Sequence, residues 1–200
     1  MKGYYFITDS QLSRAGNVSD VQQAVAAGVA VVQYRRPKAS TAALFAEALV
    51  LRRLCRGALF LVNDRVDIAL AVEADGVHLG QSDLPIAAAR LLLGRGKTIG
   101  LTVHSVKEAA EAAAAGADYL GVSPIYTTQT KADAGPPAGI ALIRQIKQLV
   151  KLPLVAIGGI NLANAPAVIH AGADGICAIS AVLTQADVRA EIGKFQRLFQ

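Results

Sequence analysis

The sequence predicts an α/β fold in which eight buried parallel strands alternate with helices. Short apolar runs are separated by helical stretches, the phrase before several runs nearly repeats, and the runs are apolar almost throughout. Each helix between two strands supplies a crossover, so the strands run parallel, and their continuous apolar character indicates burial on both faces. Eight such units favour a closed (β/α)8 barrel, the TIM barrel, over an open doubly wound sheet.

The expected strands are apolar runs bounded by Gly, Asp, Asn or Pro. In chain order they are YYFIT (4–8), AVVQYR (30–35), LFLVN (59–63), GVHLG (76–80), TIGLTV (98–103), YLGVS (119–123), PLVAIGG (153–159) and GICAIS (175–180). Two of the helices between and after them show an apolar face at helical spacing. These faces are Leu142, Ile143, Ile146, Leu149 and Val150, and Val188, Ile192, Phe195 and Phe199.

A recurring phrase marks the passage from a helix to the next strand. It reads AAGVAVVQ (26–33), EADGVHLG (73–80), AGADYLGV (115–122) and AGADGICA (171–178). A Gly or Asp ends the helix and small residues precede the apolar run, which indicates one βα module used repeatedly.

The length predicts one domain over residues 1–200. A chain of 200 residues with 53% hydrophobic content buries one sizeable core and leaves little for a second. No GxGxxG sequence follows the first strand, as a dinucleotide-binding fold would require. The one long irregular stretch, residues 124–139, stands out in so economical a barrel, and long loops of this kind are usually functional.

The composition narrows the classes of partner. The formal net charge is +5, but the basic residues are scattered, which argues against a nucleic-acid surface and favours small anionic substrates. The two cysteines, Cys55 and Cys177, show no disulfide or zinc spacing, so a reducing cytoplasm fits. No apolar run is long enough for a signal peptide or a membrane span, and the oligomeric state is not readable.

Polar residues close the expected strands, and the active sites of such barrels lie at the carboxyl ends of the strands. In chain order they are Gln33 and Arg35, Asn63 and Asp64, Gln81 and Asp83, Thr102, then Thr128, Thr130 and Lys131 in the long loop, and finally Gly158-Gly159 and Ile179-Ser180. The last two groups match the barrel's phosphate site after strands 7 and 8, although a tight turn also explains paired glycines.

Two carboxylates at neighbouring strand ends predict a magnesium site. Oxygen ligands such as those of Asp64 and Asp83 hold Mg²⁺ against a substrate phosphate. The alternative is that each residue caps the helix that follows it. Arg35 and Lys131 add positive charge to the same rim, where they are either anion ligands or solvated loop residues.

These segments resemble the thiamine-phosphate synthase family along essentially the whole chain. The resemblance rests on YFITD, QYR, NDRVDIALAVEADGVHLGQSDLP, TQTKADAGPP, VAIGGI and AISA. It implies a Mg²⁺-dependent transferase that joins hydroxymethylpyrimidine diphosphate to thiazole phosphate and releases pyrophosphate by a dissociative displacement.

The resemblance also implies a role for each matching position. Gln33, Arg35, Asn63, Thr102 and Lys131 would hold the pyrimidine diphosphate, and Arg35 and Lys131 would be catalytic by neutralising the leaving group. Asp64 and Asp83 would hold the metal. The thiazole phosphate would contact Thr128, Thr130, Gly158, Gly159, Ile179 and Ser180.

The chain departs from the family's pattern at two positions. The family's Gln-x-Arg-x-Lys places a lysine where this chain has Pro37, and a lysine follows at Lys38. Because Pro37 fixes the backbone φ, we hypothesise that the loop is redirected so that Lys38 reaches the diphosphate. Thr102 replaces the usual serine and keeps its hydroxyl.

Two further functions remain as alternatives. A thiazole tautomerase of the same superfamily would need neither diphosphate nor metal, and we expect it to carry a His where this chain has Ser123-Pro124. A non-catalytic phosphate-sensing barrel would need the phosphate cup but not the two aspartates. Dependence of turnover on a metal separates these alternatives from the synthase.

Overall fold

The chain forms a closed parallel barrel, as predicted. The computed structural model describes residues 1–130 and 135–200. In this part of the chain eight strands pair in chain order, and β1 also pairs with β8. The strands are β1 (Gly3–Ile7), β2 (Val31–Tyr34), β3 (Leu59–Asn63), β4 (Gly76–Leu79), β5 (Thr98–Val103), β6 (Tyr119–Val122), β7 (Leu154–Ile157) and β8 (Gly175–Cys177).

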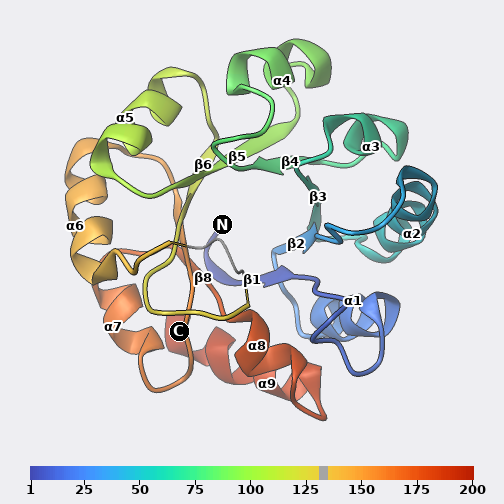
Figure 1. Ribbon diagram of the computed structural model, residues 1–200. Coiled ribbons are helices and arrows are strands. Elements are labelled where there is room, and N and C mark those ends of the chain that lie inside the picture. The colour runs from blue at the N-terminus through green and yellow to red at the C-terminus, as the bar shows by residue number, and fades with distance from the viewer. Residues whose placement is uncertain (131–134) are drawn as a thin grey trace.

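Helices surround the barrel as an outer ring (Figure 1). In the described residues they are α1 (Asn17–Ala26), α2 (Thr41–Leu54), α3 (Val66–Ala71), α4 (Ile86–Leu93), α5 (Val106–Ala114), α6 (Gly139–Leu149), α7 (Ala165–His170), α8 (Ile179–Leu183), α9 (Val188–Gln196) and the 3₁₀ turn η1 (Arg197–Phe199). Side-chain oxygens begin several of them: Ser40 caps α2, Ser105 caps α5 and Asp187 caps α9.

The structure corrects three details of the predicted elements. β7 covers Leu154–Ile157, so Gly158 and Gly159 follow the strand instead of ending it. The last strand ends at Cys177, and Ile179 and Ser180 form the first turn of α8 instead of the end of a strand. Leu149, expected on the buried face of its helix, is 57% exposed. It is the last residue of α6, and the chain turns to an extended conformation at Val150, which is buried.

The recurring phrase has a structural cause at the amino ends of the strands. In three of its copies the aspartate accepts a hydrogen bond from the backbone N–H of a residue in the preceding strand. The pairs are Asp75 with Phe60 at 2.8 Å, Asp118 with Ile99 at 2.7 Å and Asp174 with Leu154 at 2.7 Å. The same carboxylates pair with Arg52 at 3.1 Å, Arg90 at 2.6 Å and Lys147 at 2.6 Å. The repeat therefore holds neighbouring strands in register.

Two apolar layers make up the core. The larger lies between the strands and the helices. The smaller fills the barrel and consists of Tyr5, Ile7, Val31, Leu61, Tyr119, Val155 and Cys177. Among the described residues, no helix has the length and apolar character needed to cross a bilayer.

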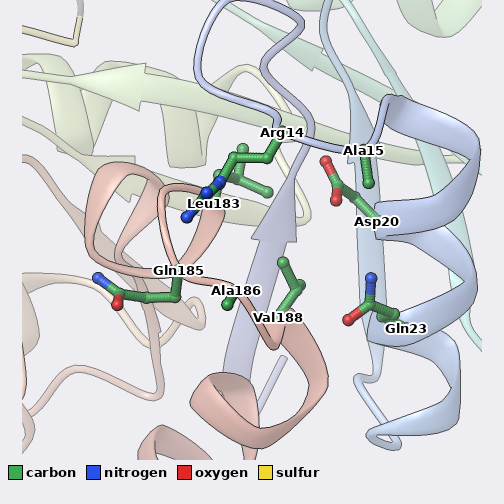
Figure 2. Close-up of a pocket in the computed structure, with 8 residues that line it drawn as sticks. All are labelled: Arg14, Ala15, Asp20, Gln23, Leu183, Gln185, Ala186 and Val188. Carbon is green, nitrogen blue, oxygen red and sulfur yellow. The ribbon is translucent and has the colours of Figure 1, made fainter.

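A small pocket of about 190 Å³ lies outside the barrel, between α1 and the α8–α9 segment. Figure 2 shows Asp20 of α1 in its wall, with Arg14 from the preceding loop and Leu183 of α8 nearby. Asp20 is 1% exposed, and its Oδ2 has no hydrogen-bond partner in the described structure. Burial raises the pKa of Asp20 above its ordinary value of 3.8, and a hydrogen bond with Ser13 opposes the shift.

This raised pKa predicts a pH-dependent stability difference. The folded state holds the Asp20 proton more tightly than the unfolded state, so the favourable contribution is complete below the ordinary pKa and is lost as pH rises through the folded pKa. Asp20→Asn removes the cost of burying a charge. Thermal unfolding should show the variant more stable than the parent at pH 7 and nearly equal to it at pH 3. A variant less stable at pH 7 would show that the carboxylate is favourably bound.

Candidate active site

The predicted pyrimidine-side residues meet at one mouth of the barrel. Gln33 lies near the end of β2, Asn63 ends β3 and Thr102 lies near the end of β5. Gln33 and Thr102 bond to side chains within the barrel, and Asn63 is two residues from the interior Leu61. Because period-2 alternation puts residues i and i+2 on one face, Asn63 shares this interior face.

Arg35 is held at the mouth by the end of β1. Its guanidinium Nη1 lies 3.5 Å from Asp9 Oδ2, and its backbone N–H donates to Thr8 Oγ1 at 2.8 Å. The next residue, Arg36, turns away to Glu47 of α2 at 3.1 Å. Of the two adjacent arginines, Arg35 is therefore the one that lies beside the end of β1, and its predicted role in the site stays a prediction.

Asp64 and Asp83 follow adjacent strands, and neither caps a helix. The residues that cap α3 and α4 are Arg65 and Pro85, without a side-chain cap bond. Asp64 has a left-handed backbone with φ 62°, and its N–H donates to the His78 carbonyl at 2.8 Å. Asp83 Oδ2 accepts the Gly80 N–H at 2.7 Å, within the turn after β4. The helix-capping alternative is thus wrong for both.

Of the two predicted lysines, the structure describes Lys38 but not Lys131. Lys38 and Pro37 lie exposed in a turn between β2 and α2. Lys131 lies outside the described residues, so its predicted roles stay predictions.

The loop after β6 is fastened to the end of β7. The Ile125 N–H donates to the Ile157 carbonyl at 2.9 Å, and the Tyr126 N–H donates to the Gly158 carbonyl at 3.0 Å. This contact brings the segment that carries Thr128 beside Gly158 and Gly159. Further along the loop, Thr128 Oγ1 accepts the Thr130 N–H at 3.3 Å.

Both glycines after β7 are required by this close approach. Their φ values are 103° at Gly158 and 62° at Gly159, in the left-handed region. A Cβ at Gly158 would lie 2.7 Å from Pro124 Cβ, and one at Gly159 would lie 2.5 Å from the Thr127 carbonyl oxygen. Ile179 and Ser180 follow β8 in the first turn of α8, so their backbone N–H groups come from a helix start.

Two supporting residues, Thr8 and Asp9, were not singled out from the sequence, and a third, Gln81, was noted at a strand end without a role. Thr8 and Asp9 belong to the YFITD segment, and Gln81 belongs to the HLGQSD segment. Gln81 Nε2 donates to the Thr102 carbonyl at 2.7 Å, which anchors the end of β5. For Thr8 and Asp9 the available signal was their place in a segment already quoted for the resemblance.

The described residues contain no clustered metal ligands and no exposed cysteine thiol. No group of three or more His, Cys, Asp or Glu side chains with the arrangement of a metal site occurs in the described residues. Both cysteines are buried. Burial raises the pKa of the Cys55 thiol to about 12 and that of Cys177 further, so neither is a ready nucleophile.

Comparison with known proteins assigns the family. The model of the thiamine monophosphate synthase family matches residues 4–182. The chain belongs to this family. It is 50% identical over 193 residues to the thiamine-phosphate synthase of Methanosarcina mazei, covering 96% of this chain and 80% of that protein. With the thiamine-phosphate synthase of Methanospirillum hungatei it shares 51% identity over 199 residues, covering 98% and 97%.

Solved structures agree with this family. The thiamine phosphate pyrophosphorylase of Pyrococcus furiosus has a TM-score of 0.90 and 42% identity, covering 98% of this chain and 94% of its own. That of Bacteroides thetaiotaomicron, at a TM-score of 0.71 and 18% identity, shares the fold, covering 99% of this chain and 97% of its own. The prediction of a thiamine-phosphate synthase, and hence of a transferase, is confirmed.

The contact between the two loops predicts the effect of a methyl group. Gly159→Ala should lose more stability than Gly116→Ala, whose φ is 90° but whose Cβ would meet nothing within 4 Å. Both variants carry the left-handed strain of about 1–2 kcal/mol, and only Gly159→Ala adds the overlap with the Thr127 carbonyl. Chemical denaturation measures the difference. Equal losses would mean that the loop moves aside without cost.

Proposed function

We propose that this synthase binds hydroxymethylpyrimidine diphosphate over β2–β5 and thiazole phosphate over β6–β8, and joins them at the mouth between. The observation that carries the proposal is that the charged residues and the glycine pair lie on different parts of the barrel mouth. Arg35, Asp64 and Asp83 follow β2, β3 and β4, whereas the glycine pair follows β7. Phosphate groups of two substrates would thus be held apart while their reacting atoms meet.

On the pyrimidine side, uncharged and charged residues are suited to different parts of the substrate. Gln33, Asn63 and Thr102 offer uncharged donors and acceptors for the ring. Arg35 offers a guanidinium fixed by Asp9, suited to a diphosphate. Lys38 and Lys131 would complete the cationic rim, with Arg35 and Lys131 catalytic.

The two aspartates fit a Mg²⁺ ion. They supply hard oxygen donors from the ends of adjacent strands, and the described residues offer no third carboxylate or imidazole for a closed protein cage. Mg²⁺ typically takes one or two carboxylates and completes its shell with water and substrate phosphate. When bound, the ion would neutralise charge on the diphosphate.

On the thiazole side, backbone amides and hydroxyls support phosphate binding. Gly158 is buried against the loop after β6, and Gly159 is half-buried and has no side chain of its own to cover its N–H group. Ile179 and Ser180 add N–H groups after β8. Thr128 and Thr130 would close the phosphate site from the loop after β6. The arrangement agrees with the general phosphate site of these barrels after strands 7 and 8.

The reaction needs no protein nucleophile. A new bond forms between the thiazole nitrogen and the pyrimidine methylene carbon, and the bond from that carbon to the diphosphate oxygen breaks. The bonding pair leaves with pyrophosphate, in a dissociative displacement. Arg35 and Lys131 would stabilise the departing charge, and fixing both substrates in one mouth supplies proximity.

The same proposal includes the binding partners of the protein and its cellular compartment. The partners are small phosphorylated molecules, with no nucleic acid or membrane involved. Two buried, unpaired thiols are compatible with a reducing cytoplasm.

Pyrophosphate release tests this function. Release should require both substrates and Mg²⁺, and should stop with EDTA. Asp64→Asn and Asp83→Asn should each lower the rate about 100-fold or more through loss of charge stabilisation. Glu111→Gln, which removes an exposed carboxylate on α5, is the matched control and should keep the parent rate.

Two outcomes would contradict the proposal. Undiminished release from the Asp64→Asn, Asp83→Asn double variant would refute the metal assignment. A folded protein that releases no pyrophosphate from both substrates with Mg²⁺ would point to the tautomerase or the phosphate-sensing barrel.

A further inference from the structure

A continuous chain of side-chain hydrogen bonds crosses the inside of the barrel. Gln33 Nε2 donates to the Tyr5 hydroxyl at 2.9 Å, and that hydroxyl lies 2.7 Å from the Tyr119 hydroxyl. The Tyr119 hydroxyl lies 2.7 Å from His78 Nδ1, and His78 Nε2 lies 2.8 Å from Thr102 Oγ1. The chain therefore begins and ends on two residues proposed to hold the pyrimidine.

Two glycines make room for this chain. A Cβ at Gly100 would overlap the ring of Tyr119, and a Cβ at Gly121 would lie 2.9 Å from His78 Cε1. Neither glycine has a left-handed φ, so the backbone conformation does not demand them. Their place in β5 and β6 is explained by the side chains that cross the barrel.

The two phenols keep their protons. Burial raises the pKa of Tyr5 and of Tyr119, each well above the ordinary value. A protonated phenol donates one hydrogen and also accepts. The Tyr5 hydroxyl accepts from Gln33, and its other partner in the described structure is the Tyr119 hydroxyl, which is therefore the acceptor for the Tyr5 hydrogen. Tyr119 in turn donates to His78 Nδ1.

The imidazole of His78 continues the donor-to-acceptor direction of these hydrogen bonds. A neutral histidine that accepts at Nδ1 carries its hydrogen on Nε2, so His78 Nε2 donates to Thr102 Oγ1. The Thr102 hydroxyl has one hydrogen of its own, which it directs to another acceptor. At the opposite end, the Gln33 nitrogen serves Tyr5, and the Gln33 carbonyl oxygen is the acceptor that it offers a ligand.

We propose that Tyr5, Tyr119 and His78 are positioning residues that fix the polarity of the pyrimidine site, with an acceptor at Gln33 and a donor at Thr102. This pattern complements an aminopyrimidine, whose exocyclic amine donates and whose ring nitrogens accept. It disfavours an oxo-pyrimidine, whose exocyclic oxygen accepts and whose adjacent ring N–H donates. The inference rests on the proposed function and adds to it a source of base selectivity.

The tautomer of His78 tests the polarity directly. ¹⁵N NMR of the ligand-free protein, with His78 assigned by comparison with His78→Gln, should show a neutral ring protonated on Nε2. Protonation on Nδ1, or on both nitrogens at neutral pH, would overturn the proposal. The hydrogen bonds would then run in the opposite direction, or their continuous donor-to-acceptor order would be interrupted at His78. This measurement needs neither substrate nor activity.

The consequence for binding is tested with Tyr119→Phe. The variant keeps the ring but removes the hydroxyl that fixes His78, and the NMR spectrum should then show a mixture of tautomers. Calorimetry with Mg²⁺ should show about tenfold weaker binding of hydroxymethylpyrimidine diphosphate and unchanged binding of inorganic pyrophosphate. Tyr34→Phe is the matched control, since its buried hydroxyl donates to Glu47 on the outer side of β2, and it should bind both ligands as the parent does.

The measurements distinguish failure of the positioning role from failure of the proposed function. Equal weakening of both ligands in Tyr119→Phe, or no weakening of either, would overturn the positioning role. A parent protein that binds pyrophosphate but not the pyrimidine diphosphate would count against the proposed function, and the NMR result would still decide the polarity of the chain.

Discussion

Parallel pairing around a closed ring brings the carboxyl ends of all eight strands to one mouth, and three aspartates at the opposite end hold that pairing in register. Asp75, Asp118 and Asp174 each accept the backbone N–H of a preceding strand and pair with a cation. Charge used for stability therefore lies at the amino ends of the strands. The charges proposed for chemistry lie at the carboxyl ends, as in other barrels of this kind.

The interior between these two ends is polar where it meets the mouth. Phenols from β1 and β6 meet at 2.7 Å, and an imidazole from β4 continues the line. Such a buried network is costly unless every member is satisfied, and a satisfied one is rigid. Rigidity is useful here because a site that fixes its donors and acceptors before the substrate arrives loses less free energy on binding.

The barrel could be predicted from the sequence because the signals for each strand and helix lie within short segments of the chain. Turn residues, apolar runs and helical spacing recur unit by unit. The strand ends were less well predicted, most of all in the last strand, where AIS continues an apolar run into α8. Arg35 was selected by its place after the second strand and by the resemblance. The structure places it beside Asp9, and its role stays a prediction. Thr8 and Asp9 were missed because they reach Arg35 only when β1 pairs with β2. The interior chain was unpredictable from spacing, since Tyr5 and Tyr119 are 114 residues apart.

The central claim is that the β2–β5 side of the mouth holds a metal diphosphate. The most direct measurement is anomalous diffraction from crystals soaked with inorganic pyrophosphate and Mn²⁺ in place of Mg²⁺. The account predicts a peak about 2 Å from carboxylate oxygens of Asp64 and Asp83, with the pyrophosphate against Arg35. A peak at other residues, or bound pyrophosphate away from both aspartates, would contradict it.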